Sequence, residues 1–312
     1  MRKTVLIFGA SSFVGSNLVE SLRDEFRVIT TFHNSPLSIP GVLSLPCDVH
    51  NKDKVSRLVQ TLRPHVTIYA AGLSSIAACN ANPKLAAALK SAGLINVCSA
   101  AERVSSKFIF FSSSFVLGGE DMVYKESDTP FPTTTYGSTL ASSEFFVQKS
   151  CLNYIVFRCC PLYGRTYHPK RRNWFESLEK SIALGLPVAM DDHVLHGHLD
   201  VQLLAKLVKI SIQQNVTNRL LQVSSKDVLS RYDFAKLYCQ LFKKDENLVT
   251  RAQWELPPDG NQARMARALA KYNYKMDLKN AEEFFKFRFP TVEESLTGTR
   301  KRLLGSHATT AT

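Results

Sequence analysis

The sequence predicts an α/β fold, a doubly wound parallel sheet with a smaller C-terminal lobe. Two observations support this prediction. Short apolar runs alternate with helix-like stretches through the first half of the chain, as in strands joined by crossover helices. The first apolar run, at 4–8, breaks directly into a turn that contains glycine. Sheets of this kind bind ligands at the carboxyl ends of their strands.

The order of the predicted elements divides the chain. Strands are expected at 4–8, 27–31, 42–46, 66–70, 107–112 and 154–159, with helices at 13–24, 52–62, 83–104 and 136–149. After residue 160 helix-like stretches dominate, at 174–184, 201–213, 231–242 and 278–286. We therefore expect a sheet domain over 1–160, a mainly helical substrate lobe over 161–304 that is interleaved with it, and a disordered tail over 305–312.

Composition and charge exclude several classes of protein. No apolar run reaches the ~18–20 residues of a membrane span, and the N-terminal run is too short for a signal peptide. We therefore expect a cytoplasmic protein without membrane association. The net charge of +12 favours a small anionic ligand. Lysine and arginine are scattered along the sequence, so we do not expect nucleic acid as a partner. The only assembly that we consider is a homodimer.

Cysteine and histidine patterns favour neither a disulfide framework nor a metal site. The seven cysteines are odd in number, lack a C-x-x-C motif and mostly lie in apolar stretches, so buried thiols are expected. The stretch 191–200 is rich in metal-ligand types, but we expect no bound metal there. Asp200 is better explained as the cap of the following helix, and His198 is expected at the edge of a substrate pocket.

The turn after the first strand has the features of a phosphate-binding loop. Gly9 permits a tight turn, and Gly15 allows the following helix to pack closely on the strand. The helix-terminal amides would then face a pyrophosphate, which makes this a Rossmann-type, NAD(P)-binding domain. The loop residues expected to contact the cofactor are Gly9, Ser11, Ser12, Phe13, Val14 and Gly15. A plain strand–turn–helix connection remains the alternative.

The second and third strands indicate which dinucleotide is bound. A carboxylate after the second strand would bind a ribose hydroxyl and mark NAD, but none is present. His33, Asn34 and Ser35 stand there instead and can accept a 2′-phosphate, so NADP is expected over NAD. At the end of the third strand, Asp48 and Val49 are expected beside the adenine. The alternative for Asp48 is to cap the next helix.

Five stretches, taken in order, resemble the extended short-chain dehydrogenase/reductases of the NAD-dependent epimerase/dehydratase superfamily, and the dTDP-4-dehydrorhamnose reductase branch above all. They are Gly9–Gly15, Tyr69-Ala70-Ala71-Gly72, Ser112–Val116, Tyr136–Glu144 and Arg158–Gly164. The resemblance implies cofactor contacts from Ala70, Ala71, Gly72 and Tyr136. It also implies that Tyr136 is the catalytic acid, that Ser113 orients the substrate carbonyl, and that Ser114 contacts the substrate, a nucleotide-activated keto-deoxysugar or a related carbonyl compound.

The sequence departs from that family at a residue with a chemical role. The family has a lysine four positions after the tyrosine, on the same helix face, where it binds the nicotinamide ribose and lowers the pKa of the tyrosine. Leu140 stands at that position, and Ser114-Phe115 replace the family's Asp-Tyr. Two interpretations stay open: a reductase with an altered site, or a non-catalytic NADP-binding regulatory or partner protein, as in the methionine adenosyltransferase beta subunit of the same branch.

A basic segment follows the last of these motifs. Arg165, Arg171 and Arg172 lie just after Leu162-Tyr163-Gly164, and the family binds the substrate diphosphate with basic groups from this lobe. The planar guanidinium suits phosphate because it can donate to two oxygens. We expect these three arginines to bind an anionic substrate. A solvated basic loop is the alternative.

Overall fold

A seven-stranded sheet organises the molecule. The computed structural model describes residues 2–34, 36, 38–72, 82–168, 172–214, 217–252 and 271–308. All strand pairs of the sheet are parallel, in the order β11-β6-β5-β4-β1-β2-β3. The strands are β1 Thr4–Phe8, β2 Arg27–Phe32, β3 Leu43–Pro46, β4 Val66–Tyr69, β5 Lys107–Ser113, β6 Tyr154–Cys159 and β11 Arg219–Val223. The predicted α/β fold class is confirmed.

The strand order places one crevice at the centre of the sheet. After β3 the chain returns to the other side of β1, where β4 pairs with it. The connections that leave β1 and β4 therefore diverge to opposite faces of the sheet. This switch point is where an open parallel sheet binds ligands, at the carboxyl ends of its strands.

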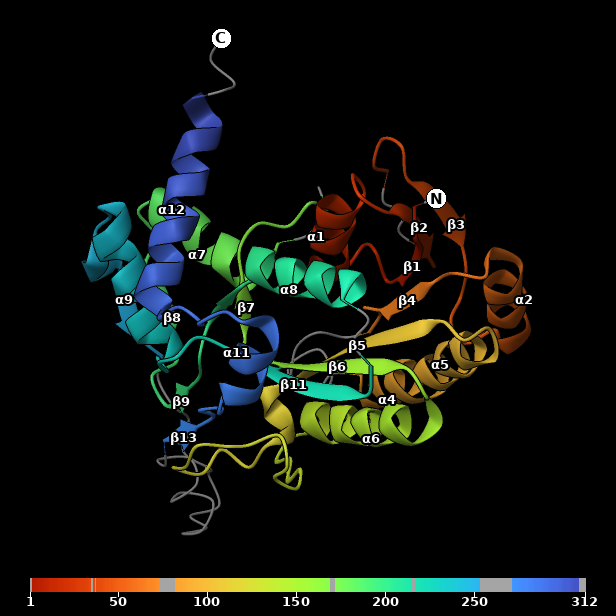
Figure 1. The fold of residues 1–312 in the computed structure, drawn as a ribbon. Helices are drawn as coiled ribbons and strands as arrows, with labels where there is room; N and C mark the ends of the chain where they lie inside the picture. Colours follow the sequence, from red (N-terminus) through yellow and green to blue (C-terminus); the bar gives the residue numbers. More distant parts are fainter. Residues whose placement is uncertain are drawn as a thin grey trace.

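Helices cover both faces of the sheet (Figure 1). Helices α1 and α8 pack against each other over one face, and α5 packs between α2 and α6 over the other. Their bounds are α1 Phe13–Leu22, α2 Lys52–Leu62, α5 Leu94–Arg103, α6 Thr135–Ser150 and α8 Val201–Gln213. The helix expected over 83–104 is formed by α4 Pro83–Ala88, a π-helical turn η1 at Leu89–Gly93, and α5.

The second half of the chain contributes to both lobes. Strand β11 pairs with β6 and so forms the seventh strand of the central sheet, which the sequence pattern did not predict. The run Arg219–Val223 has only five residues, and its partner strand lies more than 60 positions earlier. No local signal therefore marks it as a sheet strand, although interleaving of the two lobes was expected.

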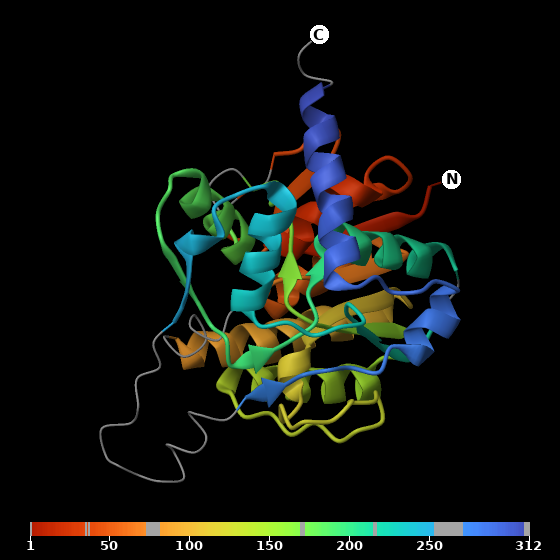
Figure 2. The same ribbon diagram turned by 90° about the vertical axis from the view of Figure 1, so that its left-hand side faces the viewer.

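The smaller lobe has a core of its own, built mostly of aromatic and aliphatic side chains from α7, α9 and α12. Helix α12 packs along α9 (Figure 2). The elements are α7 Trp174–Ala183, α9 Arg231–Phe242, α11 Lys279–Phe285, α12 Val292–Ala308, and the two-stranded parallel pairs β7 Leu162–Tyr163 with β10 Leu199–Asp200, β8 Val188–Met190 with β12 Val249–Arg251, and β9 Val194–Leu195 with β13 Tyr272–Asn273. Helix α12 continues past Leu304, where we expected an unstructured tail to begin. Within the described ranges, no helix has the length and apolar character needed to span a membrane.

Candidate functional site

The glycine turn after β1 touches the segment after β4. Gly9 has φ +84°, in the left-handed region that favours glycine. A Cβ on Gly9 would lie 2.4 Å from the backbone nitrogen of Ala71 and 2.6 Å from the carbonyl carbon of Ala70. Only a residue without a side chain permits this approach. The structure therefore brings together two of the predicted cofactor segments at the switch point of the sheet.

The first turn of α1 folds back on the same loop. A Cβ on Gly15 would lie 2.3 Å from the carbonyl oxygen of Gly9, so glycine is required here as well. Ser12 is the N-cap of α1, and its hydroxyl accepts a hydrogen bond from the Gly15 amide at 2.9 Å. Ser11, Phe13 and Val14 are half-buried. These close backbone contacts hold the loop after β1 in a tight turn that leads directly into the N-terminus of α1, an arrangement that fits the pyrophosphate of a dinucleotide.

The segment after β4 presents backbone rather than side chains to this crevice. The Tyr69 side chain is buried, and its hydroxyl donates to the carbonyl oxygen of Leu89 in the π-helical turn at 2.6 Å. A Cβ on Gly93 would lie 2.7 Å from Val49 and 2.9 Å from the Tyr69 hydroxyl, so this turn packs tightly on Val49. Tyr69 and Val49 therefore both pack against the π-helical turn Leu89–Gly93.

The ends of β2 and β3, where the sequence predicted contacts with the 2′-phosphate and the adenine, lie together. His33 Nε2 is 3.8 Å from Asp48 Oδ2, and both side chains are exposed. Asp48 Oδ1 accepts hydrogen bonds from the backbone N–H of His50 at 3.0 Å and contacts its Nδ1 at 2.9 Å; the backbone hydrogen bond above all lowers the pKa of Asp48. Helix α2 is capped by Asn51, so the capping alternative for Asp48 is wrong. Asn34 is exposed beside this group, and Ser35 lies outside the described residues.

The serine of β5 and the tyrosine of α6 come from segments in direct contact. A Cβ on Gly137 would lie only 2.0 Å from the carbonyl oxygen of Phe115, so α6 begins against the turn that follows β5. The rings of Phe115 and Tyr136 meet edge to face with centroids 6.0 Å apart. Ser113 Oγ accepts from the Phe115 amide at 3.4 Å and is 8% exposed. The Tyr-Gly pair of the motif is thus explained by packing against Phe115, which lies two residues after Ser113.

The position of the family's lysine is apolar and enclosed. Leu140 lies one turn after Tyr136 and is fully buried in the hydrophobic core. One turn further, Glu144 forms a buried ion pair with Arg158 of β6, with Glu144 Oε2 and Arg158 Nη2 2.7 Å apart. Tyr136, Leu140 and Glu144 share one helix face, so this face is fixed to the sheet.

An aromatic cluster beside Tyr136 contains two residues that the sequence did not mark as cofactor or substrate residues. His196 stacks on Tyr274 with ring centroids 4.6 Å apart, and Phe115 lies 4.8 Å from His196 and 5.2 Å from Tyr274. Burial holds the pKa of His196 far below its ordinary value, so the imidazole is neutral. His196 belongs to the histidine-rich stretch that drew attention in the sequence. Tyr274 had no signal, because it meets Phe115 only through the tertiary fold.

Two residues that we expected to contact the substrate, Ser114 and His198, are fully buried. Ser114 has no exposed surface, and its hydroxyl lies 3.4 Å from His196 Nδ1. His198 is also fully buried, with its Nε2 3.1 Å from the carbonyl oxygen of Leu229 and its ring against Trp174. Burial lowers the pKa of His198 to about 3. Both placements differ from the expectation, because packing against the aromatic rings of the second lobe draws these side chains away from the surface.

The basic segment is partly neutralised by a carboxylate. Arg165 is exposed and forms a two-pronged pair with Glu179, at 2.8 and 3.2 Å. Burial raises the pKa of Glu179 to about 7, against the opposing effect of Arg165. Arg172 is exposed, and Arg171 lies outside the described residues. The segment is anchored to the first lobe by Asn17, which donates to the Arg165 carbonyl oxygen at 2.9 Å.

The side chains of the acidic stretch before β9 already form ion pairs within the protein. Asp191, Asp192 and His193 bring possible ligand atoms within 4.8 Å of one another. Asp192 already contacts His193 Nδ1 at 2.5 Å and Arg251 Nε at 2.8 Å. The expected capping role of Asp200 is confirmed, since it accepts from the Gln202 amide at the start of α8.

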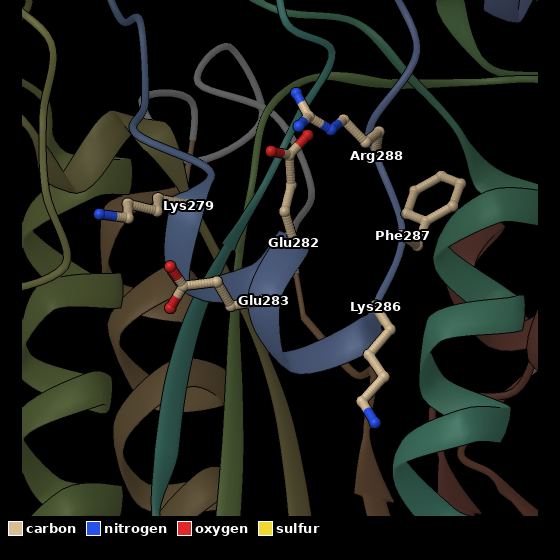
Figure 3. A pocket seen from close by; sticks show the side chains of 6 residues that line it. All are labelled: Lys279, Glu282, Glu283, Lys286, Phe287 and Arg288. Atoms are coloured by element: carbon tan, nitrogen blue, oxygen red, sulfur yellow. The ribbon is translucent and has the colours of Figure 1, made fainter.

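A surface hollow over α11 is separate from these residues. It is lined by Lys279, Glu282, Glu283, Lys286, Phe287 and Arg288. Figure 3 shows Glu282 and Arg288 pointing toward one another across it. None of the predicted cofactor or substrate residues lines this hollow, and its mixed charges do not indicate a binding site for an anion.

Comparison with known proteins identifies the family. Residues 2–304 match the family described as RmlD substrate binding domain. The chain belongs to this family. The match runs through both lobes, so the RmlD domain includes the glycine turn, the Ser113–Tyr136 region and the basic segment.

Curated relatives match only part of the chain. The dTDP-4-dehydrorhamnose reductase of Salmonella typhimurium is 26% identical over 161 residues, 51% of this chain and 52% of that protein. The chain thus aligns with about half the length of this relative. Methionine adenosyltransferase 2 subunit beta of Xenopus laevis is 30% identical over 110 residues, 35% of this chain and 33% of that protein.

Solved structures match the whole fold. The dTDP-4-dehydrorhamnose reductase from Bacillus anthracis, in complex with NADP, superposes with a TM-score of 0.80 at 22% identity and covers 97% of this chain and 100% of that one. The Bordetella bronchiseptica enzyme WbmG, in complex with NAD and UDP, has a TM-score of 0.77 at 17% identity and covers 95% and 92%. At these identities the likeness establishes the fold.

Proposed function

We propose that this RmlD-domain protein binds a nicotinamide dinucleotide, NADP in preference to NAD, in the crevice between the carboxyl ends of β1 and β4. The observation that carries the proposal is the contact between Gly9 and Ala71. It joins the loop after β1 to the segment after β4 by direct backbone contact at the switch point, where an open parallel sheet binds its ligand. His33 and Asn34 supply the exposed polar groups for a 2′-phosphate. Structures of similar fold were solved with NADP or with NAD, which supports the cofactor class.

We further propose that the protein is a reductase of a nucleotide-activated keto-deoxysugar or a related carbonyl compound. When bound, NADPH would supply the hydride. Ser113 accepts a hydrogen bond from the Phe115 amide, so its own hydrogen can be donated to the substrate carbonyl and orient it. Tyr136 would donate the proton that the reduced carbonyl oxygen takes up. Arg165 and Arg172, with Arg171, would bind the substrate diphosphate.

A second function is favoured by one residue. Leu140 offers neither charge nor hydrogen-bond donor, and it is enclosed in the core. Without a cation at this position the ribose loses a partner, and the phenol loses a charge that would favour its ionised form. A protein that binds NADP without turnover, as a regulatory or partner subunit, would tolerate this loss. The partial similarity of this chain to a methionine adenosyltransferase beta subunit agrees with a regulatory function.

A substitution at Leu140 distinguishes the two functions. The wild type, Leu140→Lys and Leu140→Met are compared for NADPH oxidation against a panel of keto-sugar nucleotides, and Leu140→Met controls for disturbed packing. If the protein is a reductase, the wild type turns over at least one of these substrates and the lysine variant is about ten-fold or more faster. Turnover in the lysine variant alone would favour the regulatory function. Absence of turnover in all three folded proteins would contradict the reductase proposal.

A further inference from the structure

Two buried cysteines face each other where α5 packs against α6. The sulfur atoms of Cys98 and Cys151 are 2.7 Å apart. Cys98 lies in the middle of α5, and Cys151 is the residue at which α6 ends. Cys98 has no exposed surface and Cys151 is 5% exposed. We propose that these two thiols are an oxidisable pair that forms an intramolecular disulfide when the protein meets hydrogen peroxide.

The surrounding structure already holds the two segments at the required distance. A disulfide needs sulfur atoms ~2.05 Å apart, so the pair needs to move only about 0.6–0.7 Å. Next to Cys151, the Leu152 amide donates to Glu102 Oε2 at 3.0 Å, and Glu102 lies one turn after Cys98 on the same helix. This hydrogen bond ties the end of α6 to α5 whether or not the sulfurs are joined. Bond formation therefore requires no rearrangement of the fold.

The difference in exposure between the two thiols predicts which of them reacts with peroxide first. Cys151, the more exposed thiol, attacks the peroxide as its thiolate. The O–O bond breaks, one oxygen leaves as water, and Cys151 becomes a sulfenic acid. The Cys98 sulfur then attacks the Cys151 sulfur, forming the S–S bond and releasing the second water. The two thiols lose two electrons and two protons, which reduce one peroxide to two waters. The contact with the Cys151 sulfur, and then burial, raise the pKa of Cys98, so the second step is expected to be slow at neutral pH.

The covalent loop would enclose the central part of the candidate site. The segment between Cys98 and Cys151 contains β5 with Ser113 and the start of α6 with Tyr136. A crosslink across a loop of this length restricts the unfolded chain much more than the native one. We therefore expect oxidation to raise the melting temperature by roughly 5–10 °C, and dithiothreitol to reverse the rise. This inference does not depend on the proposed function.

Mass spectrometry of the full chain tests the pair directly. After peroxide treatment, a non-reducing digest should contain one linked peptide that joins Cys98 to Cys151, lacking two hydrogens. The melting temperature should rise in the wild type and in the matched variant Cys159→Ser, but not in Cys151→Ser. If peroxide yields no such peptide from the folded wild type, or yields only sulfinic or sulfonic acid at Cys151, the proposal is overturned. The peptide readout needs no variant and so does not depend on whether a cysteine substitution folds.

Discussion

At the scale of single residues, glycines define the site more sharply than any reactive group. Gly9, Gly15 and Gly137 are each required because a Cβ would come within 2.4 Å of a backbone atom, which belongs to another segment for Gly9 and Gly137 and to the same turn for Gly15. Gly9 and Gly15 were predicted from spacing after the first strand. The reason for Gly137 became visible only in three dimensions, because its neighbour Phe115 comes from another segment.

Substitution of Gly9 tests the contact with Ala71. In Gly9→Ala both the positive φ and the backbone clash destabilise the native state, so we expect a loss of about 2–4 kcal/mol in the free energy of unfolding. Gly41→Ala is the matched control, since Gly41 has φ +78° with no atom within 4 Å of its Cβ, and it should cost only about 1 kcal/mol. Urea unfolding measures both. Equal losses in the two variants would show that the Ala71 contact is unimportant.

The exposed histidine after β2 allows a test of cofactor preference. In His33→Asp, a second carboxylate at the end of β2 joins Asp48 at the end of β3 and should repel a 2′-phosphate. We expect the affinity for NADPH to fall about ten-fold or more, while the affinity for NADH changes little or rises. His33→Ala controls for the loss of the imidazole. Parallel losses for both nucleotides would place the 2′-phosphate elsewhere.

At the scale of elements, α6 is attached to the sheet by the buried Glu144–Arg158 pair. Glu144→Gln leaves the guanidinium of Arg158 uncompensated, so we expect a loss of about 3–5 kcal/mol in the free energy of unfolding. The double variant Glu144→Leu/Arg158→Met removes both charges and should recover most of that loss. Chemical unfolding of the two variants gives the comparison. A double variant as unstable as the single one would mean that packing, rather than the unpaired charge, dominates.

The contact between Lys107 and the end of α8 predicts how the free energy of unfolding depends on pH. Lys107 at the start of β5 donates to the Ser211 carbonyl oxygen at 3.2 Å, and burial, with a smaller repulsion from Lys3, lowers its pKa to about 8. In the unfolded chain a lysine keeps its proton up to about pH 10.4. Between pH 8 and 10 the native state releases this proton first, so the contribution of Lys107 to the free energy of unfolding should rise.

Comparison with Lys107→Met isolates this effect from other groups that titrate in the same range. The stability of the wild type relative to the variant should increase by about 1–3 kcal/mol between pH 7.5 and 10. Denaturant unfolding at several pH values measures the difference. A wild-type advantage that stays constant or shrinks over this range would contradict a lowered pKa.

The elements also show how far the sequence could predict this fold. Strands β1 to β6 and their helices followed from apolar runs and glycine turns, because each is marked by neighbouring residues. Strand β11 and helix α12 were not predicted. The run at Arg219–Val223 is short, and it becomes a strand only because the distant β6 offers a free edge.

At the scale of the whole molecule, the second lobe contributes side chains that pack beside Tyr136. His196 and Tyr274 come from this lobe and close around Phe115 beside Tyr136. The sequence predicted the two segments that meet at the switch point, Gly9–Gly15 and Tyr69–Gly72, because each is contiguous. It did not predict that Ser114 and His198 would be enclosed, because their environment depends on rings contributed by residues far apart in the chain.

The central claim is that the loop after β1 holds a dinucleotide at the switch point of the sheet. Calorimetric titration of the full chain with NADPH, and separately with NADH, tests it most directly. We predict saturable binding at one site per chain, tighter for NADPH, and abolished in Gly9→Ala at a temperature where that variant is folded. A folded wild-type protein that gives no binding heat with either nucleotide, or binds equally well after Gly9→Ala, would contradict the claim.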